Sequence, residues 1–298
     1  MKICFVILHY MTIEDTERCI KSIIDTVNYK NYKIVVVDNG STNTSGLALE
    51  NKYQLNENVE TIILTENLGF AKGNNIGYNY ARNCVKADII IILNSDTVII
   101  DDEFVYKIIK SYQKNSFYVL GPDIITPKFE HQNPFRNRIL NIKEVKRKVL
   151  NKTIFLFYYK LKSLLKIKTR INILENLFET KSLKGRSLIN YKEYRENVVL
   201  QGACLVFSYD YIKNEENAFL PDTFMYGEED LLAYFCANKQ YKMVYDPEIK
   251  ILHMDGASTK GTCNNTLEKN LFFTKYTLEG SKILLRKMKR KTSIDSED

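Results

Sequence analysis

The chain has 298 residues, of which 45% are hydrophobic, and it carries a formal net charge of +7. This length suits one large domain with a substantial core. Its six cysteines are scattered without a C-x-x-C pair, which argues against a zinc cluster or a disulfide framework and favours a reducing compartment. The sequence begins directly with a predicted strand and holds no apolar run of about 18 residues. We therefore expect neither a signal peptide nor a membrane span.

The positive charge is concentrated in two segments. Residues 131–197 contain 17 Lys/Arg against 5 Asp/Glu, and residues 269–292 contain 8 against one, so the rest of the chain is acidic. A basic surface favours anionic lipid, nucleic acid or a phosphorylated substrate, although a solvated charged surface has the same composition. Nucleic acid is not expected as a partner, because no DNA- or RNA-binding motif accompanies the charge. Residues 154–166 place apolar bulk beside lysines, which fits an interfacial helix or a helix packed on its own domain.

The first part of the chain alternates short apolar runs with amphipathic segments. The runs are rich in Ile and Val, as buried strands of a parallel sheet are. The predicted strands cover residues 2–8, 33–37, 60–64 and 88–93. The predicted helices cover residues 14–26, 44–55, 70–84 and 101–114, with Asp101, Asp102 and Glu103 in the first turn of the last helix. This alternation, which ends near Gly121 and Pro122, is typical of a nucleotide-binding half of a doubly wound α/β fold.

The rest of the chain is less regular. Residues 123–197 are lysine-rich and weakly patterned, and we interpret them as an insertion with one or two helices outside the core sheet. Further strands are predicted at residues 198–208, 243–245 and 249–253, a short helix at 231–238, and a long basic helix at 267–290.

Polar clusters follow the four predicted strands of the first part. His9 and Tyr10 follow the first strand, residues 38–41 the second, residues 65–69 the third, and residues 94–96 the fourth. In doubly wound sheets the ligand binds outside the carboxyl ends of the strands. These four clusters therefore predict one binding site.

Two of the clusters contain a carboxylate at a strand end. Asp96 is a candidate ligand for a hard cation such as Mg²⁺ or Mn²⁺, although such a residue taken alone is more often a cap or turn residue. Asp38 suits a hydrogen bond from a base N–H or a ribose hydroxyl, and an Asx turn is the structural alternative.

The loop from Glu66 to Asn75 enters a predicted helix. Its glycines permit close backbone approach, and its N–H groups suit an anion. It matches neither G-x-G-x-x-G nor a P-loop, which counts against dinucleotide oxidoreductases and ATPases.

The second half of the chain adds a run of acids and a histidine. Glu228, Glu229 and Asp230 follow a glycine and an aromatic-rich stretch at a predicted helix start. Such a run is usually structural, but crowded and half-buried carboxylates have raised pKa values, which suits a general base. His253 closes a predicted strand, where it is either a structural residue or a contact to a metal or a phosphate.

Taken together, these motifs resemble those of the family 2 glycosyltransferases, in the branch that includes bacterial rhamnosyltransferases and other surface-polysaccharide enzymes. The motifs are Asp38-Asn39-Gly40-Ser41, Asn67-x-Gly69-Phe70-Ala71-x-Gly73-Asn74, Asn94-Ser95-Asp96, Gly227-Glu228-Glu229 and His253-x-x-Gly256. The resemblance spans residues 1–125 and 198–260 in the family's order.

The resemblance implies a GT-A fold, an α/β fold with a Rossmann-like, mostly parallel sheet flanked by helices, here with a basic helical insertion and a C-terminal helix. It divides the chain into a nucleotide-sugar-binding half (1–125), the insertion (126–197), an acceptor and catalytic half of the same domain (198–262), and a basic helix and tail (263–298). It also implies a nucleotide-diphosphate sugar donor, either dTDP-rhamnose or a UDP-hexose, and inversion at the anomeric carbon.

The family's site residues, carried over to this sequence, fall into three groups. The donor-binding group comprises His9, Tyr10, Asp38, Asn67, Gly69, Lys72, Gly73, Asn74, Asn94 and Ser95. The metal group, for Mg²⁺ or Mn²⁺, comprises Asp96 in a D-x-D-like element and His253. The catalytic group comprises Glu229 as the base, with Glu228 and Asp230 as lesser candidates.

This sequence departs from the family pattern in two places. Asn94 stands where D-x-D has its first acid, which lowers the negative charge expected at the metal. Leu231 and Phe235 stand where the family often has an acid and an arginine after the base, so Glu228 and Asp230 are retained as candidates.

The expected acceptor is a saccharide, either alone or linked to a polyprenyl diphosphate, in bacterial capsule or cell-wall polysaccharide synthesis. The basic segments would then hold the protein in the cytoplasm, peripherally on the anionic inner face of the cell membrane. One rival is a sugar-nucleotidyltransferase, but the first predicted strand lacks the Gly-rich basic loop that such enzymes usually carry. Another is a non-catalytic binding protein, which leaves the polar strand ends unexplained.

Overall fold

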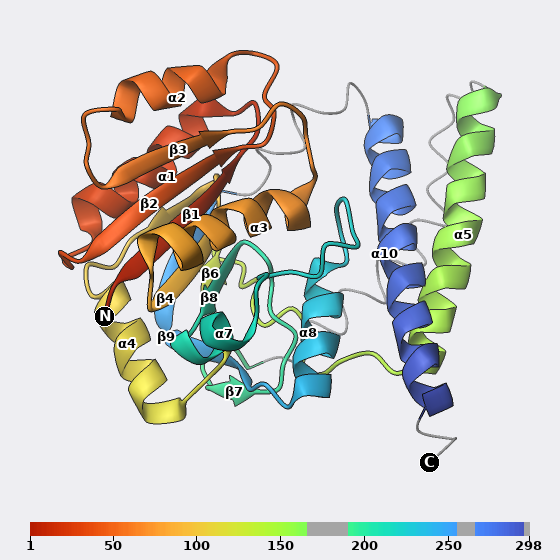
Figure 1. Cartoon of the computed structure of the whole chain (residues 1–298). Coiled ribbons are helices and arrows are strands. Elements are labelled where there is room, and N and C mark those ends of the chain that lie inside the picture. Colours follow the sequence, from red (N-terminus) through yellow and green to blue (C-terminus); the bar gives the residue numbers. More distant parts are fainter. Residues whose placement is uncertain (166–189, 255–265, 295–298) are drawn as a thin grey trace.

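The structure is a computed structural model that describes residues 1–165, 190–254 and 266–294. Its centre is a nine-stranded sheet in the order β3-β2-β1-β4-β8-β6-β9-β5, with β7 paired to β9 off this path. Helices flank the sheet, and two long helices stand side by side at one end of the molecule (Figure 1).

The first half of the chain builds the parallel part of the sheet. Strands β1 (Ile3–His9), β2 (Tyr32–Asp38), β3 (Val59–Ile63) and β4 (Ile89–Asn94) pair parallel to one another. They are connected by α1 (Ile13–Thr26), α2 (Ser45–Tyr53) and α3 (Phe70–Tyr80), which continues as the π-helix η1 (Ala81–Val85). All of these elements lie within a few residues of their predicted bounds.

The second half adds mostly antiparallel pairs, so the complete sheet is mixed. β8 (Cys204–Phe207) lies between β4 and β6 (Val119–Ile125) and is antiparallel to both. β9 (Met243–His253) pairs parallel with β6 and antiparallel with β5 (Thr97–Ile99) and β7 (Arg195–Glu196). The helices of this part are α4 (Phe104–Asn115), α7 (Tyr209–Asn214) and α8 (Glu228–Lys239).

Alternate residues of a strand face two separate cores. Ile3, Phe5 and Ile7 of β1 belong to the core that α1, α2 and α4 cover, whereas Cys4 and Val6 belong to the core on the α3, α7 and α8 side. All five side chains are fully buried. A strand covered on both faces has no polar side, which is why the sequence shows continuous apolar runs instead of alternation.

One strand was not predicted, and two predictions of strands in the second half are wrong. Gly121 and Pro122, near which the predicted alternation ends, lie inside the unpredicted strand β6, where the pairing with β9 shifts register after Pro122. Proline lacks an N–H donor, and such an irregularity accommodates it. The strands predicted at 243–245 and 249–253 are one strand, β9, which continues through Pro247. Of residues 198–208, only 204–207 form a strand.

Two further expectations need correction. The acids before α4 do not form its first turn, because the helix begins at Phe104, and Asp101 instead accepts hydrogen bonds from the backbone of Glu103 and from Lys107 Nζ. The segment interpreted as lying outside the core sheet contributes the short strand β7 to it. Residues 166–189 of that segment lie outside the described residues.

The basic segment and the C-terminal helix form a helix pair. α5 (Ile142–Leu164) starts with a capping box between Asn141 and Glu144, and α10 (Thr266–Ile294) packs along it (Figure 1). Val145 of α5, Leu231 of α8 and Leu284 of α10 are buried in a small core of their own. No helix in the described part of the chain is both long enough and apolar enough to cross a membrane.

α10 also supports the turn that precedes α8. Gly280 approaches this turn so closely that a Cβ atom there would lie 2.5 Å from the backbone oxygen of Tyr226. Tyr226 and Gly227 have positive φ angles of 65° and 104°, a conformation that a non-glycine residue adopts only under constraint. The packing of α10 therefore helps to hold the start of α8 in place.

We expect Gly280→Val to destabilise the protein by about 1–3 kcal/mol, because the new side chain must push α10 away from the Tyr226 carbonyl. Chemical denaturation measures this change. Glu279→Val, which places the same side chain at an exposed position of α10, is the matched control. Equal stability of the two variants would show that α10 is not seated as described.

Candidate functional site

The polar ends of three parallel strands lie side by side, as predicted. In the strand register His9 of β1 is opposite Asp38 of β2, and Leu8 is opposite Asn94 of β4. The carboxyl ends of β1, β2 and β4 therefore form one edge of the sheet. The polar clusters that begin at His9, Asp38 and Asn94 therefore meet at this edge.

Asp38 is fixed by its surroundings. Its side chain is buried, and Oδ1 accepts a hydrogen bond from the Ser41 N–H at 3.2 Å. Gly46, in the first turn of α2, leaves room for the carboxylate, because a Cβ atom there would collide with it. The partial positive charge at the start of α2 also favours an anion in this position. Asp38 is thus a preorganised hydrogen-bond acceptor.

His9 lies behind Asp38. It is fully buried, with Nδ1 2.7 Å from Thr16 Oγ1 and Nε2 2.7 Å from Ser45 Oγ, and Nε2 is 4.0 Å from Asp38 Oδ1. Burial lowers the pKa of His9, and the Asp38 carboxylate opposes this effect without overcoming it. We conclude that His9 is a neutral imidazole that supports Asp38. The next residue, Tyr10, is half-buried.

A set of amide hydrogen bonds shapes the loop between β3 and α3. Asn39 Nδ2 donates to Asn67 Oδ1 at 3.0 Å and to the Gly69 carbonyl at 3.2 Å, and Asn39 Oδ1 accepts from the Leu68 N–H at 3.0 Å. Gly69 has a φ of 82°, and a Cβ atom there would collide with the carbonyl oxygen of Phe224. Asn67 and Gly69 therefore set the shape of the loop, and Gly69 lets the second half of the chain approach it.

α3 begins where this loop meets the sheet. Gly73 packs tightly on β1, since a Cβ atom there would lie 2.7 Å from Leu8 Cδ1. Asn74 is buried, its Nδ2 donates to the Phe70 carbonyl at 3.0 Å, and its Oδ1 has no hydrogen-bond partner within the described ranges. A buried acceptor in this state is suited to a ligand or a water molecule. Lys72 is exposed on the same turn.

Asn75 joins this region to the second half of the chain. Its side-chain amide makes two hydrogen bonds with the backbone of Phe219, donating to the carbonyl at 2.8 Å and accepting from the N–H at 2.9 Å. The Phe70 N–H donates to the Phe224 carbonyl at 2.7 Å. Residues 219–224 are thus held against α3 at both ends.

The pairing of β5 with β9 brings the two predicted metal residues together. Asp96 directly precedes β5, and Thr97 is paired with His253. His253 Nε2 lies 3.1 Å from Asp96 Oδ1, and both side chains are buried. On the other side of the ring, His253 Nδ1 lies 2.6 Å from Gln132 Oε1.

The Asp96–His253 pair fits a divalent cation. If His253 Nδ1 donates its proton to the amide oxygen of Gln132, the lone pair of Nε2 faces the Asp96 carboxylate. Nε2 and the carboxylate oxygen are then both acceptors, and at that distance they need a proton or a cation between them. No group of three His, Cys, Asp or Glu side chains suited to a metal occurs among the described residues. A cation at this pair would therefore take further oxygens from a ligand, as Mg²⁺ does from phosphates.

Glu229 borders the same edge. It lies half-buried in the first turn of α8, and a Cβ atom at Gly202 would lie 3.3 Å from its Oε1. The next residue, Ala203, accepts a hydrogen bond from the Asn94 N–H at 2.9 Å. The turn at Gly202 and Ala203 therefore contacts both the predicted base and the end of β4 that carries Asn94, Ser95 and Asp96.

The two acids next to Glu229 have different surroundings. Asp230 forms ion pairs with Arg136 and with Lys148, whose Nζ lies 2.8 Å from Asp230 Oδ2. Burial, followed by the charge of the nearby Arg136, lowers the pKa of Lys148 to about 8. Burial, followed by the charge of Glu229, raises the pKa of Glu228 to about 7. Asp230 is paired with two cations and Glu228 is buried. Among the three candidates, Glu229 is therefore favoured as the base.

Three supporting residues were not predicted from the sequence. Gln132, Arg136 and Lys148 come from the segment between β6 and the first half of α5, which we interpreted as a basic insertion. No local spacing connects them to their partners, since Lys148 and Asp230 are 82 positions apart. Their lysine-rich context predicts surface charge, and only the fold shows which basic side chains turn inward.

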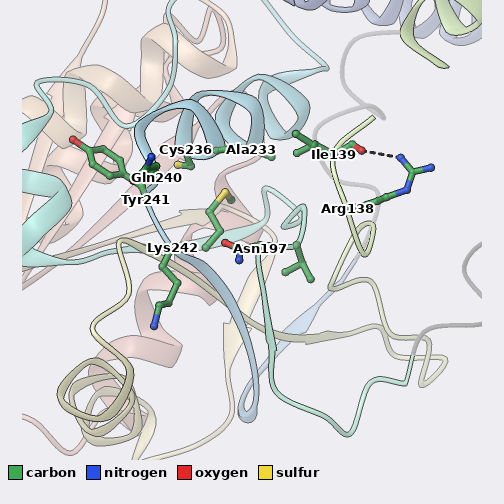
Figure 2. A pocket seen from close by; sticks show the side chains of 11 residues that line it. Arg138, Ile139, Asn197, Ala233, Cys236, Gln240, Tyr241 and Lys242 are labelled. Carbon is green, nitrogen blue, oxygen red and sulfur yellow. Dashed lines mark hydrogen bonds between the residues drawn. The ribbon is translucent and has the colours of Figure 1, made fainter. Parts of the chain in front are cut away.

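A separate cavity of about 470 Å³ lies at the other end of β9, beside the C-terminal end of α8 (Figure 2). Its lining residues are Arg138, Ile139, Asn197, Val198, Ala233, Cys236, Ala237, Gln240, Tyr241, Lys242 and Met243. None of the predicted site residues is among them. We therefore place the functional site at the carboxyl edge of the sheet and not in this cavity.

The chain is similar in sequence to a known protein. Glycosyltransferase GlyA of Streptococcus pneumoniae serotype 4 is 28% identical over 195 residues, which are 63% of this chain and 23% of that protein. The chain thus corresponds to less than a quarter of this relative.

Solved structures of S. aureus TarS share the fold. The structure of TarS 1–349 in complex with UDP-GlcNAc has a TM-score of 0.54 and 12% identity, and the alignment covers 92% of this chain and 64% of that one. The complex with UDP has a TM-score of 0.53 and 13% identity, covering 85% and 60%. The predicted GT-A fold is confirmed.

The family itself follows from the sequence match. Residues 4–212, most of the chain, match the profile of the family described as Glycosyl transferase family 2. The matched range contains the ends of β1, β2 and β4 and the α3 loop, which are the elements that build the site. This chain belongs to glycosyl transferase family 2.

Proposed function

We propose that this protein is an inverting hexosyltransferase that moves a sugar from a nucleotide-diphosphate sugar to a saccharide acceptor. The observation that carries the proposal is the convergence of Asp38, the Asp96–His253 pair and Glu229 on one edge of the sheet. A UDP-hexose is the donor we favour, because the TarS structures of the same fold hold UDP and UDP-GlcNAc. dTDP-rhamnose is the alternative that the rhamnosyltransferase-like motifs support.

Each part of the site has a role in this reaction. Asp38 accepts a hydrogen bond from the base or the ribose, and the loop from Asn67 to Asn74 forms the wall of the nucleotide pocket. Glu229 accepts the proton of an acceptor hydroxyl while the hydroxyl oxygen bonds to the anomeric carbon from the face opposite the diphosphate. The bond from the anomeric carbon to the diphosphate oxygen breaks in the same step, and the diphosphate leaves with the electron pair. Holding donor and acceptor in line supplies much of the rate.

Asp96 and His253 would hold Mg²⁺ or Mn²⁺ in this proposal. Bound there, the ion supplies positive charge to the leaving diphosphate. Asn94 and Ser95 would complete the polar strand end beside it, and Asn94 adds no charge of its own. Gln132 would fix the tautomer of His253 through the hydrogen bond to Nδ1.

We further propose that the acceptor is a polyprenyl-diphosphate-linked saccharide in bacterial cell-surface polysaccharide synthesis. The basic composition of α5 and α10 supports this, because such an acceptor lies at an anionic membrane. The protein would then work peripherally, at the inner face of the cell membrane.

We expect Glu229→Gln to lower transfer by about 10²–10⁴-fold, because the amide cannot take the acceptor proton. Donor binding, followed by thermal shift with UDP-sugars, should remain. Asp222→Asn, which neutralises an exposed acid ahead of α8, is the matched control and should leave turnover unchanged. Near-normal turnover of Glu229→Gln would remove Glu229 from the catalytic role.

We expect chelation by EDTA to abolish transfer, and added Mn²⁺ or Mg²⁺ to restore it. His253→Ala should raise the metal concentration needed for half-maximal activity, because it removes one of two protein ligands. Assays over a metal titration measure both effects. Full activity in the presence of the chelator would exclude the proposed role of Asp96.

Glu228 predicts a pH dependence of stability. Its pKa is about 7 in the folded protein and near its ordinary value of 4.5 in the unfolded chain, so the folded state binds more protons between these values. The contribution of Glu228 to the free energy of unfolding is therefore greatest below pH 4.5, and this contribution is lost as pH rises through 7. The expected loss is about 1–3 kcal/mol. Urea denaturation between pH 5 and 8 should show a smaller loss for Glu228→Gln than for the wild type; equal slopes would contradict the assignment.

A further inference from the structure

The outward side of α5 carries a continuous apolar stripe. Its members recur every three or four residues, which places them on one side of the helix over about 20 Å. They are Leu150, Ile154, Phe157, Leu161 and Leu164, and each is exposed, from 42% for Leu161 to 79% for Leu164. The opposite side of α5 carries buried Val145 and Tyr159. We call the five exposed residues the α5 stripe.

The stripe differs from the other exposed apolar residues of the protein. Leu55 and Phe129 are more exposed, at 93% and 85%, but neither belongs to a helix and each stands apart from the stripe in the sequence. Single exposed apolar residues are common, whereas a contiguous apolar patch usually marks a binding surface.

Basic side chains lie beside the stripe along α5. α5 has seven Lys/Arg and one acid, Glu144, which is already paired with Arg138 and used in the capping box. The exposed basic residues near the stripe on α5 are Lys143, Lys146, Arg147 and Lys160. The neighbouring α10 adds further exposed basic residues, namely Lys269, Lys275, Lys282, Arg286, Lys289, Arg290 and Lys291.

We infer that the α5 stripe docks on an anionic lipid bilayer, with its apolar side chains among the acyl chains and the lysines beside it at the headgroups. Charge decides between the candidate occupants. A second copy of the same face would bring two basic rims together, whereas anionic headgroups neutralise them. An apolar stripe with lysines beside it is the pattern of a helix that lies in the membrane interface.

α5, the docking helix, contacts α8, the helix that carries Glu229. Lys148 of α5 pairs with Asp230 of α8, the residue after Glu229, and Val145 and Leu231 belong to the same small core. Docking through the α5 stripe would therefore hold Glu229 at a fixed height above the bilayer. This deepens the proposed function, because a lipid-linked acceptor would then be presented to Glu229 from the membrane side.

Vesicle co-sedimentation of the full chain tests the inference. We expect the wild type to bind vesicles of equal parts phosphatidylglycerol and phosphatidylcholine, and to bind pure phosphatidylcholine much more weakly. Phe157→Glu should weaken binding to the anionic vesicles by about tenfold or more, since it removes an aromatic ring that docking would bury among the acyl chains and adds a negative charge that the anionic lipid repels. Lys160→Glu should weaken binding at low salt and less so at high salt.

Leu55→Glu is the matched control, because it places the same charge at an exposed apolar position outside the α5 stripe; it should bind as the wild type does. Phe157→Glu must also keep the wild-type thermal shift with UDP-sugars, which separates loss of docking from loss of donor binding. Wild-type vesicle binding by Phe157→Glu would overturn the inference. So would a wild-type dimer, seen by light scattering, that Phe157→Glu dissociates, because the stripe would then bind a second copy.

Discussion

The alignment of strand ends is the constraint on which the site depends. The register of β1, β2 and β4 sets Asp38 and Asn94 at the same edge of the sheet, on either side of β1, and the antiparallel pairing of β5 with β9 returns the chain to the same edge with His253 beside Asp96. A slip of one residue between β5 and β9 would turn His253 to the other face of the sheet. The chemistry therefore rests on backbone hydrogen bonds that are far apart in the sequence, and not on any local motif alone.

The first half of the fold and its site residues could be predicted because their signals are local. Ile/Val runs buried on both faces mark the strands, and the polar residue after each run lies at the functional edge without any knowledge of long-range pairing. The second half lacks such signals. β6 and β9 each continue through a proline. α5 has an inward face that carries Lys148 and Tyr159 and an outward face that carries Phe157. Which lysine turns inward depends on an acid 82 positions away, and no local pattern records that.

Charge burial explains how three adjacent acids at the start of α8 take different roles. Asp230 is buried with two cations, and removing one partner of such a group is costly because the other charge is left uncompensated. Within the described ranges Glu228 is buried with no cation paired to it, and its pKa is therefore raised to about 7. Glu229 lies between them, half-buried, at the turn that also contacts the end of β4. The segment that supplies Arg136 and Lys148 is thus part of the site as well as a basic surface.

The two hydrogen bonds between the Asn75 amide and the Phe219 peptide have a consequence for engineering new specificities. They are buried, so polar atoms lose their partners in the interior if Asn75 is replaced by a residue without an amide, or if the backbone at position 219 is displaced. Each unpaired group costs about 1–3 kcal/mol. A hybrid enzyme that joins the N-terminal half of this chain to the C-terminal half of a related enzyme would therefore lose these hydrogen bonds, unless α3 and residues 219–224 come from the same parent. Crossover points for such hybrids should lie outside both segments.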